Sequence, residues 1–168
     1  MLKKFYHSKL KPDYYAEDLR SFDWQQLKKH KIKIIFLDID NTLAKHGSRK
    51  PDDYAIAVVQ IIQDHGFDIC ILSNAMSERI EEFAGHLKVD FLENARKPSP
   101  KRLINKLQET NYNASEAILV GDQLFTDVWA GNNAGCMTVL VKQRFYDEAI
   151  QVKLKRKLEQ WFINRFDK

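Results

Sequence analysis

The feature that most constrains the fold is the alternation of apolar, strand-like runs with helical patterns after residue 31. Runs that are apolar at successive positions are typical of strands buried on both faces. Such strands, separated by single helices, predict an α/β fold with a parallel sheet covered on both sides and joined by right-handed crossovers. The predicted strands are 32–38, 67–73, 89–92, 117–121 and 137–142, and the predicted helices are 52–65, 77–87, 99–110 and 125–134.

Length and composition fit one ordinary domain with its own core, since the chain has 168 residues and 44% of them are hydrophobic. Charges interrupt every apolar run, and no apolar segment follows the basic N-terminus, so we expect neither a membrane span nor a secretory signal. The net charge of +4 suggests anionic partners without identifying one. We predict one domain over 1–168, with an amphipathic lead-in at 1–30, a core at 31–143 and a basic terminal helix at 144–168.

Smaller signals agree with this outline. Gly66 and Gly135 follow predicted helices and are expected to end them, and Ser99 is expected to cap a helix that starts at Pro100. Cys70 and Cys136 each lie in an apolar run. We expect both to be buried free thiols rather than a disulfide or a catalytic cysteine, which suits a reducing cytoplasm.

Polar side chains gather where the predicted strands end. In open α/β sheets, ligands bind beyond the carboxyl ends of the strands. The first strand ends in "FLDIDNTL", where two aspartates, one residue apart, point to the same side. Later strands also lead into groups useful to phosphate or metal chemistry. Over all the strand ends, the residues are Asp38, Asp40, Ser73, Asn74, Arg96, Lys97, Gly121, Asp122 and Asp127.

Four carboxylates at one edge of a sheet repel one another unless a cation lies between them. Oxygen ligands suit Mg²⁺, which would also attract a phosphate group. Lys97 would supply a second positive charge, and Ser73 offers a hydroxyl to a phosphoryl oxygen. A carboxylate nucleophile can attack phosphorus and form an aspartyl-phosphate.

Four segments in order, "DIDNT", "LSN", "RKP" and "GDQLFTD", resemble the four motifs of the haloacid dehalogenase (HAD) superfamily of phosphohydrolases. The resemblance covers residues 32–142. Within the superfamily, "IFLDIDNTL" and "GDQLFTDVWAGNNAG" are similar to the YqeG-like branch of subfamily IIIA, which includes phosphatidylglycerophosphate phosphatases. The resemblance implies a HAD-like Rossmannoid three-layer sandwich. Its five-stranded sheet would have the order 5-4-1-2-3, counting the predicted strands along the chain.

The resemblance also implies a role for each motif residue. Asp38 would be the nucleophile and a metal ligand. Asp40 would act as general acid and then as general base, and would bind Mg²⁺ through its backbone carbonyl. Thr42 would orient the loop, and Ser73 with the amide of Asn74 would hold the phosphoryl group. The remaining roles are charge neutralisation by Lys97 and metal binding by Asp122 and Asp127.

Two positions depart from the pattern expected of relatives. Ala75 follows "SN" where another Asn is expected, and Asn133 stands where Arg is common. Haloacid dehalogenases lack the second aspartate of the first motif, so the presence of Asp40 excludes their chemistry. A phosphatase needs this residue, because an acid must protonate its alkoxide leaving group. Only 30 residues lie between Thr42 and Ser73, and 23 between Ser73 and Lys97, so there is no room for a cap domain. An uncapped site is open to lipid headgroups, proteins or nucleic acid ends.

Structural interpretations compete with these functional ones. Asp40, Ser73 and Asn74 could be caps or turn residues, Asp127 could act only on a helix dipole, and Lys97 could be a solvated loop residue. His46 lies in the predicted flap, the loop after the first motif, where it could touch substrate or only solvent.

The terminal helix has an apolar stripe at helical spacing, formed by Ile150, Leu154, Leu158, Trp161 and Phe162. Beside it lies a basic face of Lys153, Lys155, Arg156 and Lys157. That helix could pack on the sheet or lie on an anionic membrane.

The leading hypothesis is an Mg²⁺-dependent phosphomonoesterase with phosphatidylglycerophosphate as a candidate substrate. It would act in the cytoplasm or at the inner membrane face. A phosphatase for a soluble sugar, a nucleotide or a nucleic acid end is the second hypothesis. The third is a regulatory or ribosome-associated binding module that keeps the pocket without catalysis. The intact set of Asp38, Asp40, Lys97 and Asp122 argues against the third.

Overall fold

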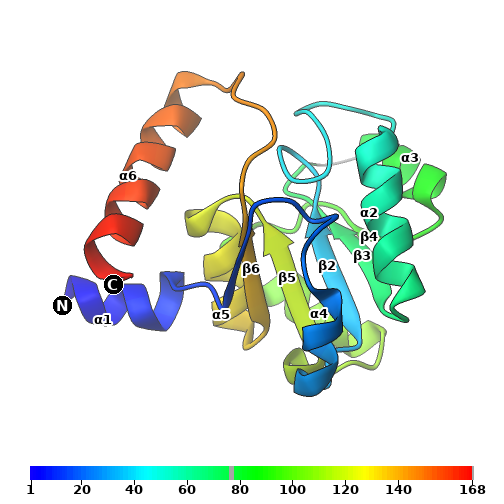
Figure 1. Cartoon of the computed structure of the whole chain (residues 1–168), viewed down its shortest axis with the longest axis horizontal. Helices are drawn as coiled ribbons and strands as arrows, with labels where there is room; N and C mark the ends of the chain where they lie inside the picture. Colours follow the sequence, from blue (N-terminus) through cyan, green and yellow to red (C-terminus); the bar gives the residue numbers. More distant parts are fainter. Residues whose placement is uncertain (76–77, 168) are drawn as a thin grey trace.

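A six-stranded parallel sheet forms the centre of the structure, a computed structural model that describes residues 1–75 and 78–167 (Figure 1). The strand order is β1-β6-β5-β2-β3-β4. The predicted α/β class and the order of the five predicted strands are confirmed, but the sheet has six strands rather than five. The strands are β1 (Tyr14–Ala16), β2 (Ile34–Asp38), β3 (Asp68–Leu72), β4 (Asp90–Leu92), β5 (Ala117–Gly121) and β6 (Met137–Val141).

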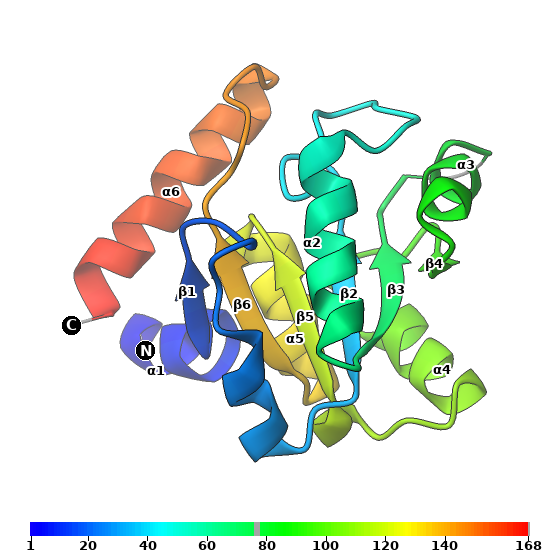
Figure 2. The same cartoon turned by 45° about the vertical axis from the view of Figure 1, so that its right-hand side comes forward.

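The additional strand, β1, lies in the segment predicted as an amphipathic lead-in. It pairs in parallel with β6, with Tyr14 opposite Val139 and Ala16 opposite Val141 (Figure 2). The Asp13 side chain continues this edge, because its Oδ2 accepts a hydrogen bond of 2.8 Å from the Thr138 amide. A strand of three residues flanked by charged and Pro residues has no hydrophobic run long enough to predict it.

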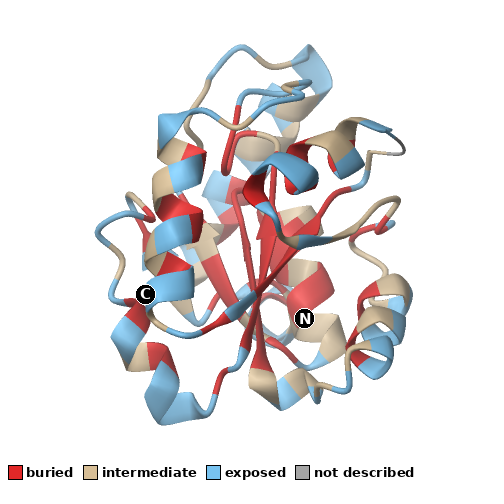
Figure 3. Ribbon diagram, turned by 90° about the vertical axis from the view of Figure 1, so that its right-hand side faces the viewer, coloured by how far each residue is buried: buried red, intermediate tan, exposed pale blue. Residues whose placement is uncertain are grey.

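Helices cover both faces of the sheet and make three layers. Alternation along β2 sends Ile35 and Leu37 to the face covered by α2 (Asp53–Asp64), α3 (Glu78–Leu87) and the 3-10 helix η2 (Trp24–His30). Ile34 and Phe36 point to the opposite face, under α4 (Lys101–Glu109) and α5 (Trp129–Ala134). The central strands β2 and β5 are buried along their whole length between these layers (Figure 3). Cys70 and Cys136 are buried free thiols, as predicted.

Local chemistry explains where several helices begin and end. Asp52 caps α2 by accepting a 2.9 Å hydrogen bond from the Ala55 amide. Gly135 ends α5 with a φ of 80°, in the left-handed region that favours glycine. The predicted cap at Ser99 is wrong: α4 begins at Lys101 with Pro100 at its cap, and Ser99 lies in a turn with Arg96. Residue 77 of the predicted helix 77–87 lies outside the described residues.

The two ends of the chain lie side by side next to the sheet (Figure 1). α6 (Ile150–Phe166) lies beside the N-terminal α1 (Leu2–Phe5) and the π-helical turn η1 (Tyr6–Leu10) (Figure 1). Phe162 of α6 packs in a cluster with Tyr6 and with Leu124 of the π-helical turn η4 (Leu124–Val128). A short 3-10 helix, η3 (Ala114–Glu116), precedes β5. In the part of the chain that the structure describes, no helix is both long and apolar enough to cross a membrane.

Candidate active site

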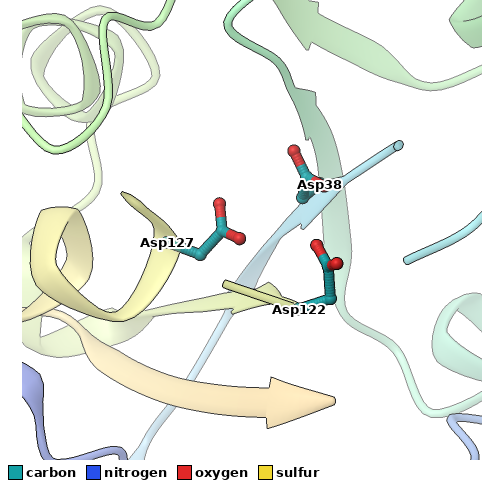
Figure 4. Close-up of side chains that lie close together, drawn as sticks. All are labelled: Asp38, Asp122 and Asp127. Carbon is teal, nitrogen blue, oxygen red and sulfur yellow. The ribbon is translucent and has the colours of Figure 1, made fainter. Parts of the chain in front are cut away.

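Three buried carboxylates meet at the carboxyl ends of β2 and β5 (Figure 4). Asp38 is the last residue of β2, Asp122 directly follows β5, and Asp127 lies in η4. Each offers an oxygen within 4.8 Å of the others. Gly121 permits this approach, because a Cβ at that position would overlap the Asp127 carboxylate. The topology therefore brings together three of the four aspartates that the sequence predicted as a group.

Lys97 lies between two of these carboxylates. Its Nζ is 2.6 Å from Asp38 Oδ1 and 2.5 Å from Asp127 Oδ1, with 5% of the side chain exposed. The buried Thr42 hydroxyl lies 3.4 Å from Asp38 Oδ2 and 3.3 Å from Asp122 Oδ1. Lys97 is thus not a solvated loop lysine, and Thr42 bridges the first and fourth motifs.

The electrostatics of this cluster are those of a site short of positive charge. Burial raises the pKa of Asp38 well above its usual range and raises the pKa of Asp122 to about 6, and Asp127 adds to both shifts. Burial alone would lower the pKa of Lys97, but Asp127 and Asp38 raise it above its usual value. Three buried carboxylates face the single Lys97 ammonium group, and Arg156, which contacts Asp122, is shared with Glu148. Oxygen donors with this excess of negative charge fit a divalent cation.

Asp40 stands apart from the buried cluster. Its two oxygens pair with the Arg79 guanidinium at 3.0 and 2.9 Å, and its Oδ2 lies 3.5 Å from Nδ1 of the exposed His46. The Gly47 amide donates to Asp40 Oδ1 at 3.2 Å. Asp40 is therefore anchored by α3 and by the loop that carries His46 and Gly47, and it lines the same cavity as Asp38.

Ser73 and Asn74 follow β3 and also line this cavity. Asn74 holds the Lys97 backbone from both sides, accepting from its amide at 2.7 Å and donating to its carbonyl at 3.1 Å. The buried Ser73 Oγ accepts from the Ala75 amide at 3.1 Å. The Asn74 side chain thereby sets the position of Lys97, a role that the sequence did not suggest.

A cavity of about 520 Å³ opens above these groups. Asp38, Asp40, Ser73, Lys97 and Asp127 line one part of it, and residues before and within α6 line another. The buried Asn41 Oδ1 also belongs to a cavity-lining residue and has no hydrogen-bond partner among the described residues. Among residues 1–75 and 78–167 no cap domain covers the opening, since α2 with its preceding loop joins β2 to β3, and α3 is the helix between β3 and β4.

A family model for mitochondrial PGP phosphatases matches residues 4–145. The chain belongs to this family. It is a phosphatase of the HAD superfamily, in the YqeG-like branch that the motifs resembled. The match covers β1 through β6 and includes each of the four motif segments.

Individual relatives agree with the family. "Probable phosphatase YqeG" of Bacillus subtilis is 29% identical over 164 residues, which cover 98% of this chain and 93% of that protein. "Phosphatidylglycerophosphate phosphatase 1, chloroplastic/mitochondrial" of Arabidopsis thaliana is 27% identical over 92% of this chain, but the chain covers only 47% of that protein. The cobalt-bound structure of the deoxy-D-mannose-octulosonate 8-phosphate phosphatase YrbI from Haemophilus influenzae has a TM-score of 0.53 at 16% identity. The match covers 82% of this chain and 90% of that chain. That likeness concerns the fold.

Two arginines contribute to the site of this PGP phosphatase family member without having been predicted there. Arg79 of α3 holds Asp40, as described above. Arg156 of α6 donates to Asp122 Oδ2 and to both oxygens of Glu148. No motif marks either residue; in "KLKRKLE", the only signal is that Arg156 is an arginine among lysines, suited to bidentate contacts.

The position of Arg156 corrects the predicted basic face of the terminal helix. Arg156 and Lys155 point inward, since Lys155 Nζ donates to Gln123 Oε1 at 3.0 Å. Of the two arrangements left open for the apolar stripe, packing against the rest of the domain holds for one of its five residues. Phe162 is buried, but Ile150, Leu154, Leu158 and Trp161 are 47–72% exposed.

Proposed function

We propose that the chain is an Mg²⁺-dependent phosphomonoester hydrolase that works through an aspartyl-phosphate. The observation that carries the proposal is the buried group of Asp38, Asp122 and Asp127 around Lys97 at the carboxyl ends of adjacent strands. Mg²⁺ suits oxygen-only donors. When bound, it would offset phosphate charge and polarise the phosphoryl group.

The proposed roles follow the positions of the side chains. Asp38 lies on the cavity floor, where its carboxylate attacks phosphorus. Lys97 neutralises Asp38 and the incoming phosphate, and Ser73 with the Asn74 amide holds phosphoryl oxygens. Asp40, on the cavity wall, protonates the leaving oxygen and then takes a proton from the water that hydrolyses the aspartyl-phosphate. Metal ligands would come from Asp38, the Asp40 carbonyl, Asp122 and Asp127, and Thr42 would keep the loop in register.

We propose phosphatidylglycerophosphate as the substrate. Support comes from the family description and from the Arabidopsis relative's name. The absence of a cap among the described residues also fits a substrate whose bulk stays outside the site. An open pocket cannot surround a small sugar phosphate, so binding energy must come from contacts elsewhere.

We also propose that residues 1–168 act as one unit in the cytoplasm, peripheral to the inner membrane face. Support comes from the outward face of α6, which we define as Ile150, Leu154, Leu158 and Trp161 together with the exposed Lys153 and Lys157. The single acidic residue of α6, Glu159, is buried on the opposite side. Apolar side chains with flanking lysines suit the surface of an anionic bilayer.

A phosphatase panel tests the proposal. Phosphatidylglycerophosphate in anionic vesicles, a sugar phosphate, a nucleotide and a 5′-phosphorylated oligonucleotide are compared, each with Mg²⁺ and with chelator. We expect the highest kcat/KM on the lipid, and loss of turnover in chelator. A much higher kcat/KM on a soluble phosphate would favour the second candidate, a soluble-substrate phosphatase. Absence of turnover on every substrate would favour a non-catalytic binding module.

A further inference from the structure

Arg156 contacts Asp122 at two points. Its Nη2 donates to Asp122 Oδ2, and its Nη1 donates to the Asp122 backbone carbonyl at 3.0 Å. The Asp122 side chain is fully buried and that of Arg156 is 15% exposed. The guanidinium therefore fixes both the backbone and the carboxylate of Asp122 with a single rigid group.

The other Asp122 oxygen remains directed at the carboxylate cluster. Oδ1 lies 3.3 Å from the Thr42 hydroxyl, which is also 3.4 Å from Asp38 Oδ2. A cation held between Asp38, Asp122 and Asp127 would thus meet Oδ1, while Arg156 occupies Oδ2. The two positive groups would share the carboxylate through different oxygens instead of competing for one.

Arg156 is itself held in place from a different part of the chain. Its Nε donates to Glu148 Oε1 and Oε2 at 2.8 and 2.7 Å, and the Glu148 side chain is 4% exposed. Glu148 Oε1 also accepts a 2.9 Å hydrogen bond from Asn41 Nδ2. Asn41 directly follows Asp40, so the chain of contacts runs from the first motif through Glu148 and Arg156 to the fourth motif.

We infer that Arg156 is a positioning residue for the divalent cation, which orients Asp122 Oδ1 toward the cluster, and that Glu148 and Asn41 keep Arg156 in place. The inference rests on the proposed metal-dependent function. Groups that orient a metal ligand commonly change metal affinity by about tenfold to a hundredfold when they are removed. The competing interpretation is that Arg156 only anchors α6, in which case its loss would lower stability without changing metal binding.

The test measures the Mg²⁺ midpoint, from melting temperature against Mg²⁺ concentration and from calorimetric titration, for four variants. Arg156→Gln should raise the midpoint about tenfold to a hundredfold. Arg156→Lys should raise it less, because a lysine keeps the charge but cannot make the two-point contact. Glu148→Gln should shift it in the same direction by a smaller factor, since Arg156 remains. Arg165→Gln, which changes an exposed arginine of the same helix, should leave it unchanged.

The melting temperature in chelator measures the stability of each variant separately from its metal affinity. If Arg156→Gln does not fold, Arg156→Lys and Glu148→Gln still decide the test. A lower melting temperature in chelator with unchanged Mg²⁺ midpoints across the set would overturn the inference in favour of an anchor for α6. A lower midpoint in Arg156→Gln would show competition and overturn it as well. A wild-type protein indifferent to Mg²⁺ would instead reject the proposed metal site, and the inference with it.

Discussion

The Asp38 carboxylate combines two properties that normally oppose each other. It is buried, which disfavours its charged form, yet it lies 2.6 Å from the Lys97 ammonium group, which favours that form. We predict that Asp38→Asn abolishes phosphatase turnover, because a neutral amide cannot attack phosphorus. The fold should persist, since Asn removes repulsion from Asp122 and Asp127. Steady-state kinetics with a circular dichroism melt would check both points, and full activity in Asp38→Asn would refute the proposed mechanism.

Glu159 is a second buried carboxylate, on the inner side of α6. Burial raises its pKa to about 7 from an ordinary value of 4.5, although it accepts a hydrogen bond from the Phe125 amide. Between about pH 4.5 and 7 the unfolded chain gives up this proton while the folded chain keeps it, so the group's contribution to stability falls as pH rises.

We therefore predict that Glu159→Gln is more stable than the wild type at pH 8, by on the order of 1–3 kcal/mol, and equal to it near pH 4.5. Gln keeps an acceptor for the Phe125 amide and does not ionise. Urea unfolding of both proteins from pH 4.5 to 8 would measure the difference. If the difference in unfolding free energy between the two proteins is constant from pH 4.5 to 8, Glu159 has the same pKa in the folded and unfolded chains.

The sequence revealed the motif residues of the site but not the arginines that hold them. Asp38 and Asp122 were predictable because each stands where an apolar strand ends, which places it at the ligand-binding edge of any parallel sheet. The contacts of Arg79 and Arg156 depend on how far α3 and α6 are rotated about their own axes. Local sequence leaves that rotation open, and only the packed molecule determines it.

At the scale of the element, α6 has two faces with different partners. Its inner side carries Arg156, Glu159 and Phe162, while its outward face is apolar and flanked by Lys153 and Lys157. Helical periodicity predicted both stripes but left open whether the apolar one packs on the sheet or faces a membrane. The structure packs Phe162 and pairs Arg156 inside, so the stripe that begins at Ile150 faces outward.

We predict that Leu154→Ser with Leu158→Ser weakens binding to anionic vesicles, and that Lys153→Gln with Lys157→Gln weakens it by about 1 kcal/mol per lysine at low salt. Sedimentation with phosphatidylglycerol-containing vesicles would measure both effects, with neutral vesicles as the control. Melting temperatures and turnover of a soluble ester would verify that the fold and the site are intact. Equal vesicle binding by both double variants and the wild type would reject the membrane-facing role.

At the scale of the molecule, the proposed metal joins residues that are far apart in the chain, at the ends of β2 and β5 and in η4. A cation that binds only the folded state stabilises it by mass action, by about 2.7 kcal/mol at a hundredfold excess over Kd. For a chain of this size that corresponds to a rise in melting temperature of roughly 5–10 °C. We predict such a rise on adding Mg²⁺, and its loss in Asp122→Ala. The same melting temperature in millimolar Mg²⁺ and in chelator would count against the site.

The pairing of β1 with β6 has a consequence for the order in which the molecule folds. Asp13 and Thr138, which meet at this edge, are 125 residues apart in the chain. Contacts between such distant segments require the intervening chain to be ordered first, because closing a long loop costs entropy before any pairing rewards it. The edge strand should therefore join last and open first. In native-state hydrogen exchange, the amides of β1 would exchange before those of β2 and β5, which lie at the centre of the sheet.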